Sequence, residues 1–293
     1  MHLNIFVSQR CFVSCKGCYS FSRNENFNQE LDTKTIVDFL KYAYFKGIKK
    51  VTLCGGDPLT RKDIVNLLMQ IKSIGMFITL DTVGTTLIRD VKCGNNIIYN
   101  KVDIHKIAEL VDTIGIPFDG SSNEIFKKFR QTNFDLFSDQ LEIIQQLIKN
   151  NANICINTVV HKGNLNDSKS LCEIINQLDG INKWQLFKFI PIGKYGSLNK
   201  KLFDITDEEF NIYGKEILEK SNKSDIIEFK GMEVRNKLYM LIDNSGNAWV
   251  SDYSQELLND YNSNFYNRNI IGNITRRSDW AKICNVIKGG KSK

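Results

Sequence analysis

The sequence predicts an α/β fold, a partial (β/α)6 barrel with a C-terminal α+β extension. Short apolar segments alternate with amphipathic helical segments from the N-terminus to about residue 191. The strand segments are apolar almost throughout, which is typical of a parallel sheet that helices cover on its outer face. Six such units are two short of a closed eight-stranded barrel. We therefore expect a curved sheet that is open on one side.

The alternation defines six strands and five helices between them. Each predicted helix places apolar residues three and four positions apart, so one face of it can pack against the sheet. The strands are predicted at LNIFVS (3–8), KVTLC (50–54), FITLDT (77–82), IGIPFD (114–119), ICINTVV (154–160) and WQLFKFIP (184–191). The helices are predicted near 36–44, 64–71, 102–111, 136–149 and 168–178.

The pattern changes after residue 191. Thr206 and Glu209 have the spacing of a capping box, so a helix should begin there. The segment KLYMLIDNSGNAWVS indicates a hairpin that turns at residues 244–246. We therefore expect residues 1–191 to form the core. Residues 192–293 should form an extension that covers one end of the barrel and contributes to substrate binding.

The composition is that of an ordinary globular protein, with 42% hydrophobic and 25% charged residues. No apolar run approaches the roughly 18 residues of a membrane span, and the N-terminal MHLNIFVSQR is too short for a signal peptide. We expect a cytoplasmic protein that does not bind membranes. The net charge is +6, but basic and aromatic residues do not cluster, so we expect no nucleic-acid partner.

Three cysteines, Cys11, Cys15 and Cys18, follow the first strand in the segment CFVSCKGCY. A structural zinc site needs four ligands, and no CxxC pair or His-x-x-x-His follows to complete one. A [4Fe–4S] cluster takes one thiolate per iron, so three cysteines leave one iron open to a ligand. A disulfide is unfavourable in a reducing compartment. We favour the cluster; a zinc or redox site is the alternative.

The spacing Cx3Cx2C, followed by an aromatic residue after a first strand, is typical of the radical S-adenosylmethionine (SAM) enzymes. This chain resembles that superfamily. The resemblance implies a TIM-like partial barrel and one [4Fe–4S] cluster held by Cys11, Cys15 and Cys18. It also implies that SAM binds the open iron, with Tyr19 against its adenine.

Further motifs support the resemblance over residues 3–191. CGGDP (54–58) resembles the Gly-Gly-Glu-Pro segment that receives the amino group of SAM, with Asp for Glu. DTVGTT (81–86) resembles the Thr-Asn-Gly turn after the third strand. IPFDGSSNEIFKKFR (116–130) resembles a segment that lies near the ribose and carboxylate of SAM, with Pro117 in place of a serine. The resemblance thus implies cofactor contacts from Tyr19, Gly55, Gly56, Asp57, Pro58, Asp81, Thr82, Asp119, Arg130 and Asn157.

In this superfamily, one electron from the reduced cluster splits SAM into methionine and a 5′-deoxyadenosyl radical, which removes a hydrogen atom from the substrate. An electron donor such as flavodoxin or ferredoxin is therefore implied. The radical reacts with any nearby C–H bond, so the top of the barrel should be covered.

We expect the substrate to be a peptide, modified as in the maturation of ribosomal peptide products. FKFIPIGKYG (187–196) resembles the stretch that leaves the barrel in peptide- and protein-modifying members. The extension contains only Cys284, too few thiols for an auxiliary cluster. The alternative is a small-molecule enzyme, of cofactor biosynthesis or like viperin, which acts on a nucleotide. Asn157 and Trp184 match viperin, but Cys155 and Gln185 replace its lysines. A non-enzymatic metal-binding module is the third hypothesis.

Four further residues are candidates for direct roles. Cys155 could donate a hydrogen atom to a substrate radical, although burial as a small apolar residue is the more common reason for such a cysteine. His161, after the same strand, could act as a general base, but a lone loop histidine is usually solvated. Lys188 and Lys194 are candidate substrate-binding residues near the end of the sixth strand.

Overall fold

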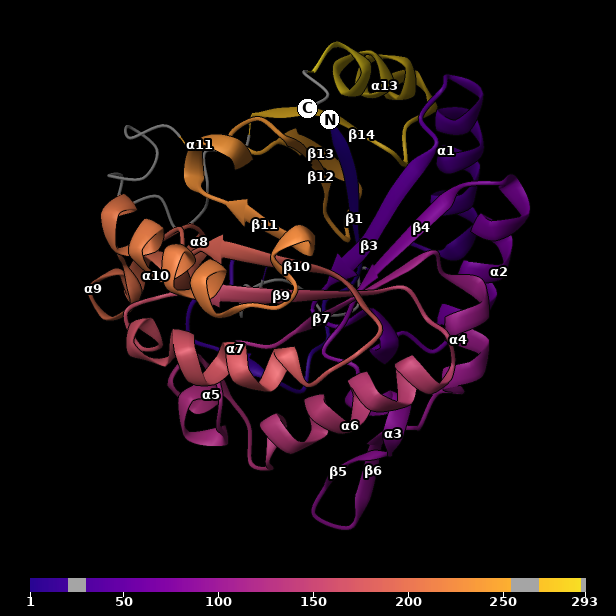
Figure 1. Ribbon diagram of the computed structural model, residues 1–293. Coiled ribbons are helices and arrows are strands. Elements are labelled where there is room, and N and C mark those ends of the chain that lie inside the picture. The colour runs from indigo at the N-terminus through magenta and orange to yellow at the C-terminus, as the bar shows by residue number, and fades with distance from the viewer. Residues whose placement is uncertain (21–29, 254–268, 291–293) are drawn as a thin grey trace.

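The computed structural model describes residues 1–20, 30–253 and 269–290 (Figure 1). Within these ranges, one sheet contains ten strands in the order β11-β10-β9-β7-β4-β3-β1-β12-β13-β14. Its six core strands are parallel: β1 (His2–Ser8), β3 (Lys50–Gly55), β4 (Phe77–Asp81), β7 (Thr113–Pro117), β9 (Ile154–Val160) and β10 (Ile181–Lys188). They are the six strands that the sequence predicts.

The five predicted helices are also present, and they lie outside the sheet (Figure 1). They are α1 (Thr33–Phe45), α2 (Ile64–Ile74), α4 (Ile104–Leu110), α6 (Leu136–Lys149) and α7 (Ser168–Asn176). Their buried faces, for example Leu40 and Leu67, pack in one apolar cluster with the outward side chains of the strands, such as Leu53 and Ile114. The partial (β/α)6 barrel is thus confirmed.

Residues 192–253 and 269–290 add strands at both edges of this sheet. β11 (Ile227–Lys230) pairs in parallel with β10, and β12 (Tyr239–Ile242) pairs in parallel with β1. β13 (Asn247–Val250) and β14 (Ile270–Asn273) continue the sheet in antiparallel register. The predicted hairpin is therefore β12–β13, but its parallel pairing with the first strand was not foreseen.

The curvature of the sheet follows from this connection. The chain leaves β11 at residue 230 and enters β12 at residue 239, although the two strands lie on opposite sides of the six core strands. Nine steps of extended chain reach roughly 30 Å at most. The two sides of the sheet must therefore curve toward one another, as in a barrel with an open side.

Short elements connect the larger ones. The helix predicted at Thr206 is α10 (Asp207–Lys220), and its capping box is formed. The smaller helices are α3 (Thr85–Ile88), α5 (Asn123–Phe129), α8 (Gly193–Leu198), α9 (Lys200–Phe203), α11 (Met232–Arg235) and α13 (Trp280–Gly289). The 3-10 turns are η1 (Pro58–Thr60), η2 (Leu165–Asp167), η3 (Ser224–Ile226) and η4 (Arg277–Asp279). β2 (Ser14–Cys15) pairs with β8 (Arg130–Gln131), and β5 (Val91–Cys93) with β6 (Asn96–Tyr99).

The sequence did not predict α3, α5 or the β5–β6 hairpin. Each of these helices and strands has seven residues or fewer, too few for a hydrophobic period to be recognised. The hairpin turns at Gly94 and Asn95, and Gly94 has a φ of 57°. In the described ranges, no helix has both the length and the apolarity that crossing a bilayer requires.

The buried side chain of Arg61 joins the start of the barrel to the first helix. Its Nη1 donates to Val7 O at 3.1 Å and to Leu31 O at 2.7 Å, and its Nη2 donates to Thr33 Oγ1 at 3.1 Å. Asp63 is its ion-pair partner, 2.7 Å from Nε. One guanidinium therefore donates to main-chain carbonyls of two separate segments, the first strand and the residues before the first helix.

Replacing Arg61 should destabilise the whole barrel. In Arg61→Met the carbonyls of Val7 and Leu31 lose their charged donor, and we expect a loss of about 3 kcal/mol in the free energy of unfolding. Urea denaturation followed by circular dichroism measures it. Lys62→Met, at the exposed neighbouring position, is the matched control and should change stability by less than about 0.5 kcal/mol. Equal losses in both variants would contradict this role of Arg61.

Candidate active site at the carboxyl ends of the strands

The loop after β1 carries the three cysteines, and β8 holds it. Ser14 and Cys15 pair in antiparallel register with Gln131 and Arg130, and Lys16 N–H donates to Phe129 O at 2.8 Å. The loop is folded back, because Cys18 N–H donates to Cys15 O at 3.3 Å. Phe129 and Phe189 pack so closely below Gly17 that a Cβ there would lie 2.5 and 2.6 Å from their rings.

The three thiols are close enough to influence one another. Burial raises the pKa of Cys11 well above its usual value and that of Cys15 to about 12, and the neighbouring thiols add to both shifts. Arg130 opposes the shift at Cys15, because its Nη1 lies 3.5 Å from Sγ. Cys11 and Cys15 are therefore protonated until a metal displaces their protons.

The arrangement fits a cluster better than a single ion. Over the ranges that the structure describes, no three His, Cys, Asp or Glu side chains converge as the ligands of one metal ion would. A [4Fe–4S] cluster is held differently, with each thiolate on its own iron, so the ligands surround a body of several ångströms. Three neighbouring thiols on one short loop match that requirement.

The segment after β3 is attached to both ends of the cysteine loop. Gly56 N–H donates to Ser8 O and Asp57 N–H to Arg10 O, each at 2.7 Å. Ser20 Oγ donates to Gly55 O at 2.9 Å. Gly55 has a φ of 135°, and a Cβ on it would lie 2.2 Å from Ser8 O. The protein's own backbone therefore requires glycine at position 55.

Asp57 is fully buried and accepts three internal hydrogen bonds. Leu59 N–H and Thr82 Oγ1 donate to its Oδ1 at 2.9 and 2.7 Å, and Val83 N–H donates to Oδ2 at 3.0 Å. Burial nevertheless raises its pKa. Asp57 thus caps η1, of which Pro58 is the first residue, and binds the turn after β4. A contact with the SAM ammonium stays a prediction for Asp57, and a cofactor contact stays a prediction for Thr82.

Asp119 and Arg130 form an ion pair behind the cysteine loop. Arg130 Nε donates to Asp119 Oδ2 at 2.5 Å, while Val159 N–H donates to Oδ1 at 2.8 Å. Asp119 is fully buried. Since Arg130 also reaches Cys15, this pair connects the ends of β7 and β9 to the predicted cluster ligand. Contact of the pair with SAM stays a prediction.

A row of side chains crosses the inner face of the barrel. Asp81, Gly115, Cys155 and Lys183 are consecutive partners across β4, β7, β9 and β10. A Cβ on Gly115 would lie 2.0 Å from Asp81 Oδ1, so only glycine leaves space for that carboxyl. We did not single out Gly115, although an isolated glycine in an apolar strand signals such an approach.

In this row, Asp81 and Cys155 both have raised pKa values, which favour their uncharged forms. Burial raises the pKa of Asp81 to about 6, opposed by Asn157 Nδ2, which donates to Oδ1 at 3.4 Å. Burial and the charge of Asp81 raise the pKa of Cys155 to about 12, and its Sγ lies 3.5 Å from Asn157 Oδ1. Cys155 therefore keeps its S–H at neutral pH. Its role as a hydrogen-atom donor stays a prediction, as does the cofactor role of Asn157.

One carboxylate binds the lysines of this inner face. Glu228 lies 2.8 Å from Lys183 Nζ and 2.7 Å from Lys230 Nζ, and Gln185 Nε2 donates to it at 2.9 Å. Burial raises its pKa, but these three partners outweigh burial and lower it to about 2. The network was not predicted, because β11, which carries Glu228 and Lys230, has no signal of its own in the sequence.

His161 is buried, in contrast to the solvated position that is usual for a lone histidine in a loop. Its Nδ1 accepts a hydrogen bond from Gly163 N–H at 3.0 Å, and its ring stacks on Phe129 with centroids 4.9 Å apart. Burial lowers its pKa to about 4. His161 is thus neutral and packed in an aromatic cluster with Phe189 and Phe203, while its function as a base stays a prediction.

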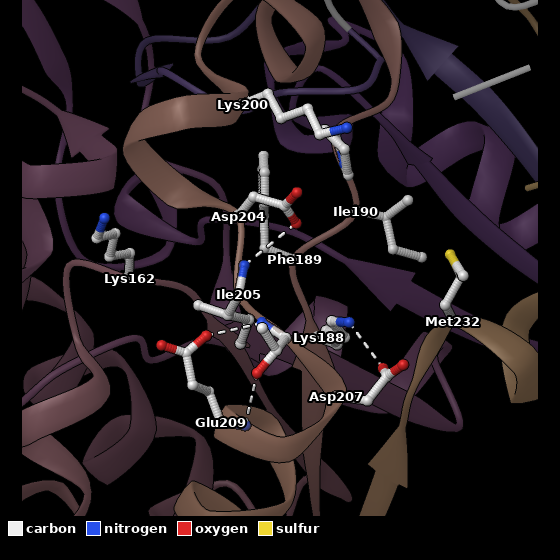
Figure 2. A pocket seen from close by; sticks show the side chains of 12 residues that line it. Lys162, Lys188, Phe189, Ile190, Lys200, Asp204, Ile205, Asp207, Glu209 and Met232 are labelled. Carbon is white, nitrogen blue, oxygen red and sulfur yellow. Dashed lines mark hydrogen bonds and ion pairs between the residues drawn. The ribbon is translucent and has the colours of Figure 1, made fainter. Parts of the chain in front are cut away.

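A pocket of about 390 Å³ lies beyond the end of β10 (Figure 2). Lys188 projects into it, and its Nζ pairs with Asp207 at 2.7 Å. The rest of the lining combines apolar side chains with charges of both signs: Lys162, Phe189, Ile190, Pro191, Lys200, Asp204, Ile205, Thr206, Glu209 and Met232. Lys194 lies on α8, outside this lining. Tyr19 is 38% exposed, and the centroid of its ring lies 6.0 Å from that of Phe6. Their predicted roles are not tested by these positions.

Comparison with known proteins agrees with this geometry. The Radical SAM superfamily pattern matches residues 5–173. A probable GTP 3′,8-cyclase of Methanococcus aeolicus is 25% identical over 82% of this chain and 73% of its own. An S-adenosylmethionine-dependent nucleotide dehydratase of Flammeovirga pacifica is 22% identical over 88% of this chain and 85% of its own.

Two solved structures have the same fold. SuiB of Streptococcus suis, bound to S-adenosylmethionine, superposes with a TM-score of 0.68 at 15% identity, over 96% of this chain. The chain spans 65% of SuiB, slightly less than two thirds of its length. anSMEcpe, with bound AdoMet and Kp18Cys peptide, superposes with a TM-score of 0.66 at 13% identity, over 98% of this chain and 82% of its own.

The ligand assignment predicts the iron content of cysteine variants. After anaerobic reconstitution the protein should contain about four irons per chain. Cys11→Ala, Cys15→Ala and Cys18→Ala should each fall below about one iron per chain, because a two-thiolate site holds the cluster poorly. Cys93→Ala, the matched control at an exposed thiol, should remain at about four. Iron and visible absorbance are measured; a cluster retained in Cys15→Ala would contradict the assignment.

The raised pKa of Asp81 predicts a pH-dependent difference in stability. Its folded-state pKa of about 6 exceeds the unfolded value of 3.8, so the native state binds the proton more tightly. Stability from this group is present at low pH and is lost as pH rises through about 6. Relative to the wild type, Asp81→Asn should therefore gain stability between pH 4.5 and about 6 and remain level above it. Urea denaturation across this range measures the difference, and a constant difference would contradict the shift.

Proposed function

This chain belongs to the radical SAM superfamily, and from that premise we propose that it modifies a polypeptide substrate. It is an enzyme that uses a [4Fe–4S] cluster and SAM, as the members of this superfamily do. When bound, the cofactors would supply the radical chemistry by which a hydrogen atom is removed from the substrate. The protein's own residues hold the cofactors, orient the substrate and keep water away from the reaction.

We assign the cluster to Cys11, Cys15 and Cys18. Arg130 then places a positive charge beside the thiolate of Cys15, and the ion pair with Asp119 fixes the orientation of the Arg130 guanidinium. The glycines after β3 and the turn after β4 lie at the same end of the barrel, tied to the cysteine loop and to one another through Asp57. This end supplies the backbone groups that would bind SAM.

The single observation that favours a polypeptide is the charge of the inner face. Lys183 and Lys230 share the carboxylate of Glu228, so together these three groups carry only one net positive charge. Asp81 adds a carboxyl, and Cys155 and Gln185 are uncharged. A nucleoside triphosphate carries about four negative charges, and burying them needs unpaired cations. The inner face suits a neutral or cationic group, such as an amino-acid side chain.

The pocket at the end of β10 is consistent with an extended chain. Its floor is apolar at Phe189, Ile190 and Met232, while lysines and carboxylates stand around it (Figure 2). A peptide presents alternating apolar and polar groups of either sign, which such a lining can accept. The structurally similar anSMEcpe binds a peptide, which agrees with this proposal at the level of the fold.

A nucleotide is the second candidate. The observation that favours it is the similarity to a nucleotide dehydratase over 88% of this chain and 85% of that protein. The third hypothesis, a metal-binding module without catalysis, is set aside because the chain belongs to a family of enzymes.

Isotope transfer distinguishes the two substrates. The reconstituted protein is supplied with dithionite, SAM and either deuterated peptides, whose sequences are taken from any short reading frames beside its gene, or deuterated ribonucleoside triphosphates. We expect deuterium in 5′-deoxyadenosine with a peptide and none above background with GTP, ATP, CTP or UTP. Mass spectrometry measures it. Cys15→Ala is the blank, and deuterium from a nucleotide alone would refute the polypeptide proposal.

A further inference from the structure

The cysteine loop has a second face, which looks away from the inner face of the barrel toward the β5–β6 hairpin. A surface pocket of about 490 Å³ lies there, and Cys11 is part of its wall. The remaining wall comes from the loop, the hairpin and the segment after β8: Phe12, Val91, Lys92, Cys93, Ile98, Tyr99, Gln131, Thr132, Asn133 and Phe134. We call these residues the hairpin rim.

The hairpin rim is firmly built. The ring of Phe12 lies 6.1 Å from that of Tyr99 and 6.4 Å from that of Phe134. Arg89 stacks over Phe134 at 4.6 Å and pairs with Asp139 at 2.7 Å. These contacts hold both the hairpin and the segment after β8 against the cysteine loop. The pocket is therefore a fixed feature next to Cys11.

The outer side of the rim has the properties of a protein contact surface. Ile97 and Ile98 are consecutive residues of β6 and are 50% and 51% exposed, and Ile98 is the one that lines the pocket. Lys92 is exposed, and the residues that line the pocket include no carboxylate. An apolar centre with a basic edge favours an acidic partner, because opposite charge accelerates encounter and orients it.

We propose that the hairpin rim is the docking surface for an acidic redox protein that passes one electron to the cluster. The proposal rests on the radical SAM chemistry and on Cys11 as a ligand, and it is independent of the substrate. One electron leaves the partner's flavin and enters the cluster; no bond is formed or broken. Weak redox complexes bury less than about 1,200 Å² in total, so a small surface is sufficient.

Alkylation of Cys93 tests where the partner binds. Cys93 is the exposed thiol of the rim, whereas Cys54, Cys155, Cys172 and Cys284 are buried and the other three would hold the cluster. A saturating amount of a bacterial flavodoxin should slow maleimide alkylation of Cys93 by at least about fivefold. A cysteine introduced by Lys215→Cys, at a position that is 77% exposed on α10, is the control and should react at an unchanged rate. Equal rates at Cys93 with and without flavodoxin would overturn the proposal.

Two substitutions test whether the surface matters for electron transfer. Lys92→Glu reverses the basic edge and Ile98→Asp disrupts the apolar centre. Flavodoxin-driven reduction of the cluster, followed as bleaching of its visible absorbance, should slow about tenfold in each. Reduction by dithionite needs no docking and should stay unchanged. Lys215→Glu is the matched charge reversal and should behave as the wild type.

The outcomes separate this inference from the proposed function. Wild-type flavodoxin rates in both variants would refute the hairpin rim, whatever the substrate. A cluster that survives Cys11→Ala would refute it as well, because the pocket would then not adjoin the cluster. Deuterium transfer from a nucleotide would refute the polypeptide proposal and leave the rim supported. A variant whose cluster is no longer reduced by dithionite has lost the cluster itself. In that case the other variant and the protection of Cys93 from alkylation test the proposal.

Discussion

The candidate site depends on main-chain hydrogen bonds that hold a loop with little core of its own. Gly56 and Asp57 donate to the carbonyls of Ser8 and Arg10 at one end of the cysteine loop, and Lys16 donates to Phe129 at its middle. These bonds fix three strand ends relative to one another before any cofactor is bound. Since cluster ligands must stand at set separations, such a frame lowers the entropy that binding would otherwise cost.

Carboxylates in this barrel are placed for opposite electrostatic purposes. Glu228 is held ionised by two lysines and an amide, so its charge cancels a cation that could have bound a phosphate. Asp81 has one weak amide donor, and burial raises its pKa to about 6. The inner face thus holds one fixed ion network and one carboxyl whose charge depends on what lies beside it. A substrate that carries a positive group would favour the ionised form of Asp81.

Local sequence patterns predicted the parts of the fold that are themselves local. The six core strands and five helices are long and periodic, and the capping box at Thr206 is formed by residues three apart. Long-range pairings had no such signal. β12 joins β1 in parallel across more than 230 residues, and the internal role of Asp57 depends on Thr82. The cysteine spacing predicted the candidate site, whereas Glu228 could not be placed without knowing that β11 lies beside β10.

The two faces of the cysteine loop have different physical demands. A carbon-centred radical reacts with any C–H bond within reach. The face toward the inner barrel must therefore hold the substrate close and keep other reactive groups away. An electron donor is a whole protein and requires an open, accessible face. In our proposal the hairpin rim provides that face. The short connection between β11 and β12 lies elsewhere, where it joins the two sides of the core sheet. In our two proposals, the nine-residue segment from Cys11 to Tyr19 has the electron donor on one side and the substrate on the other, so the two partners need not compete for the same surface.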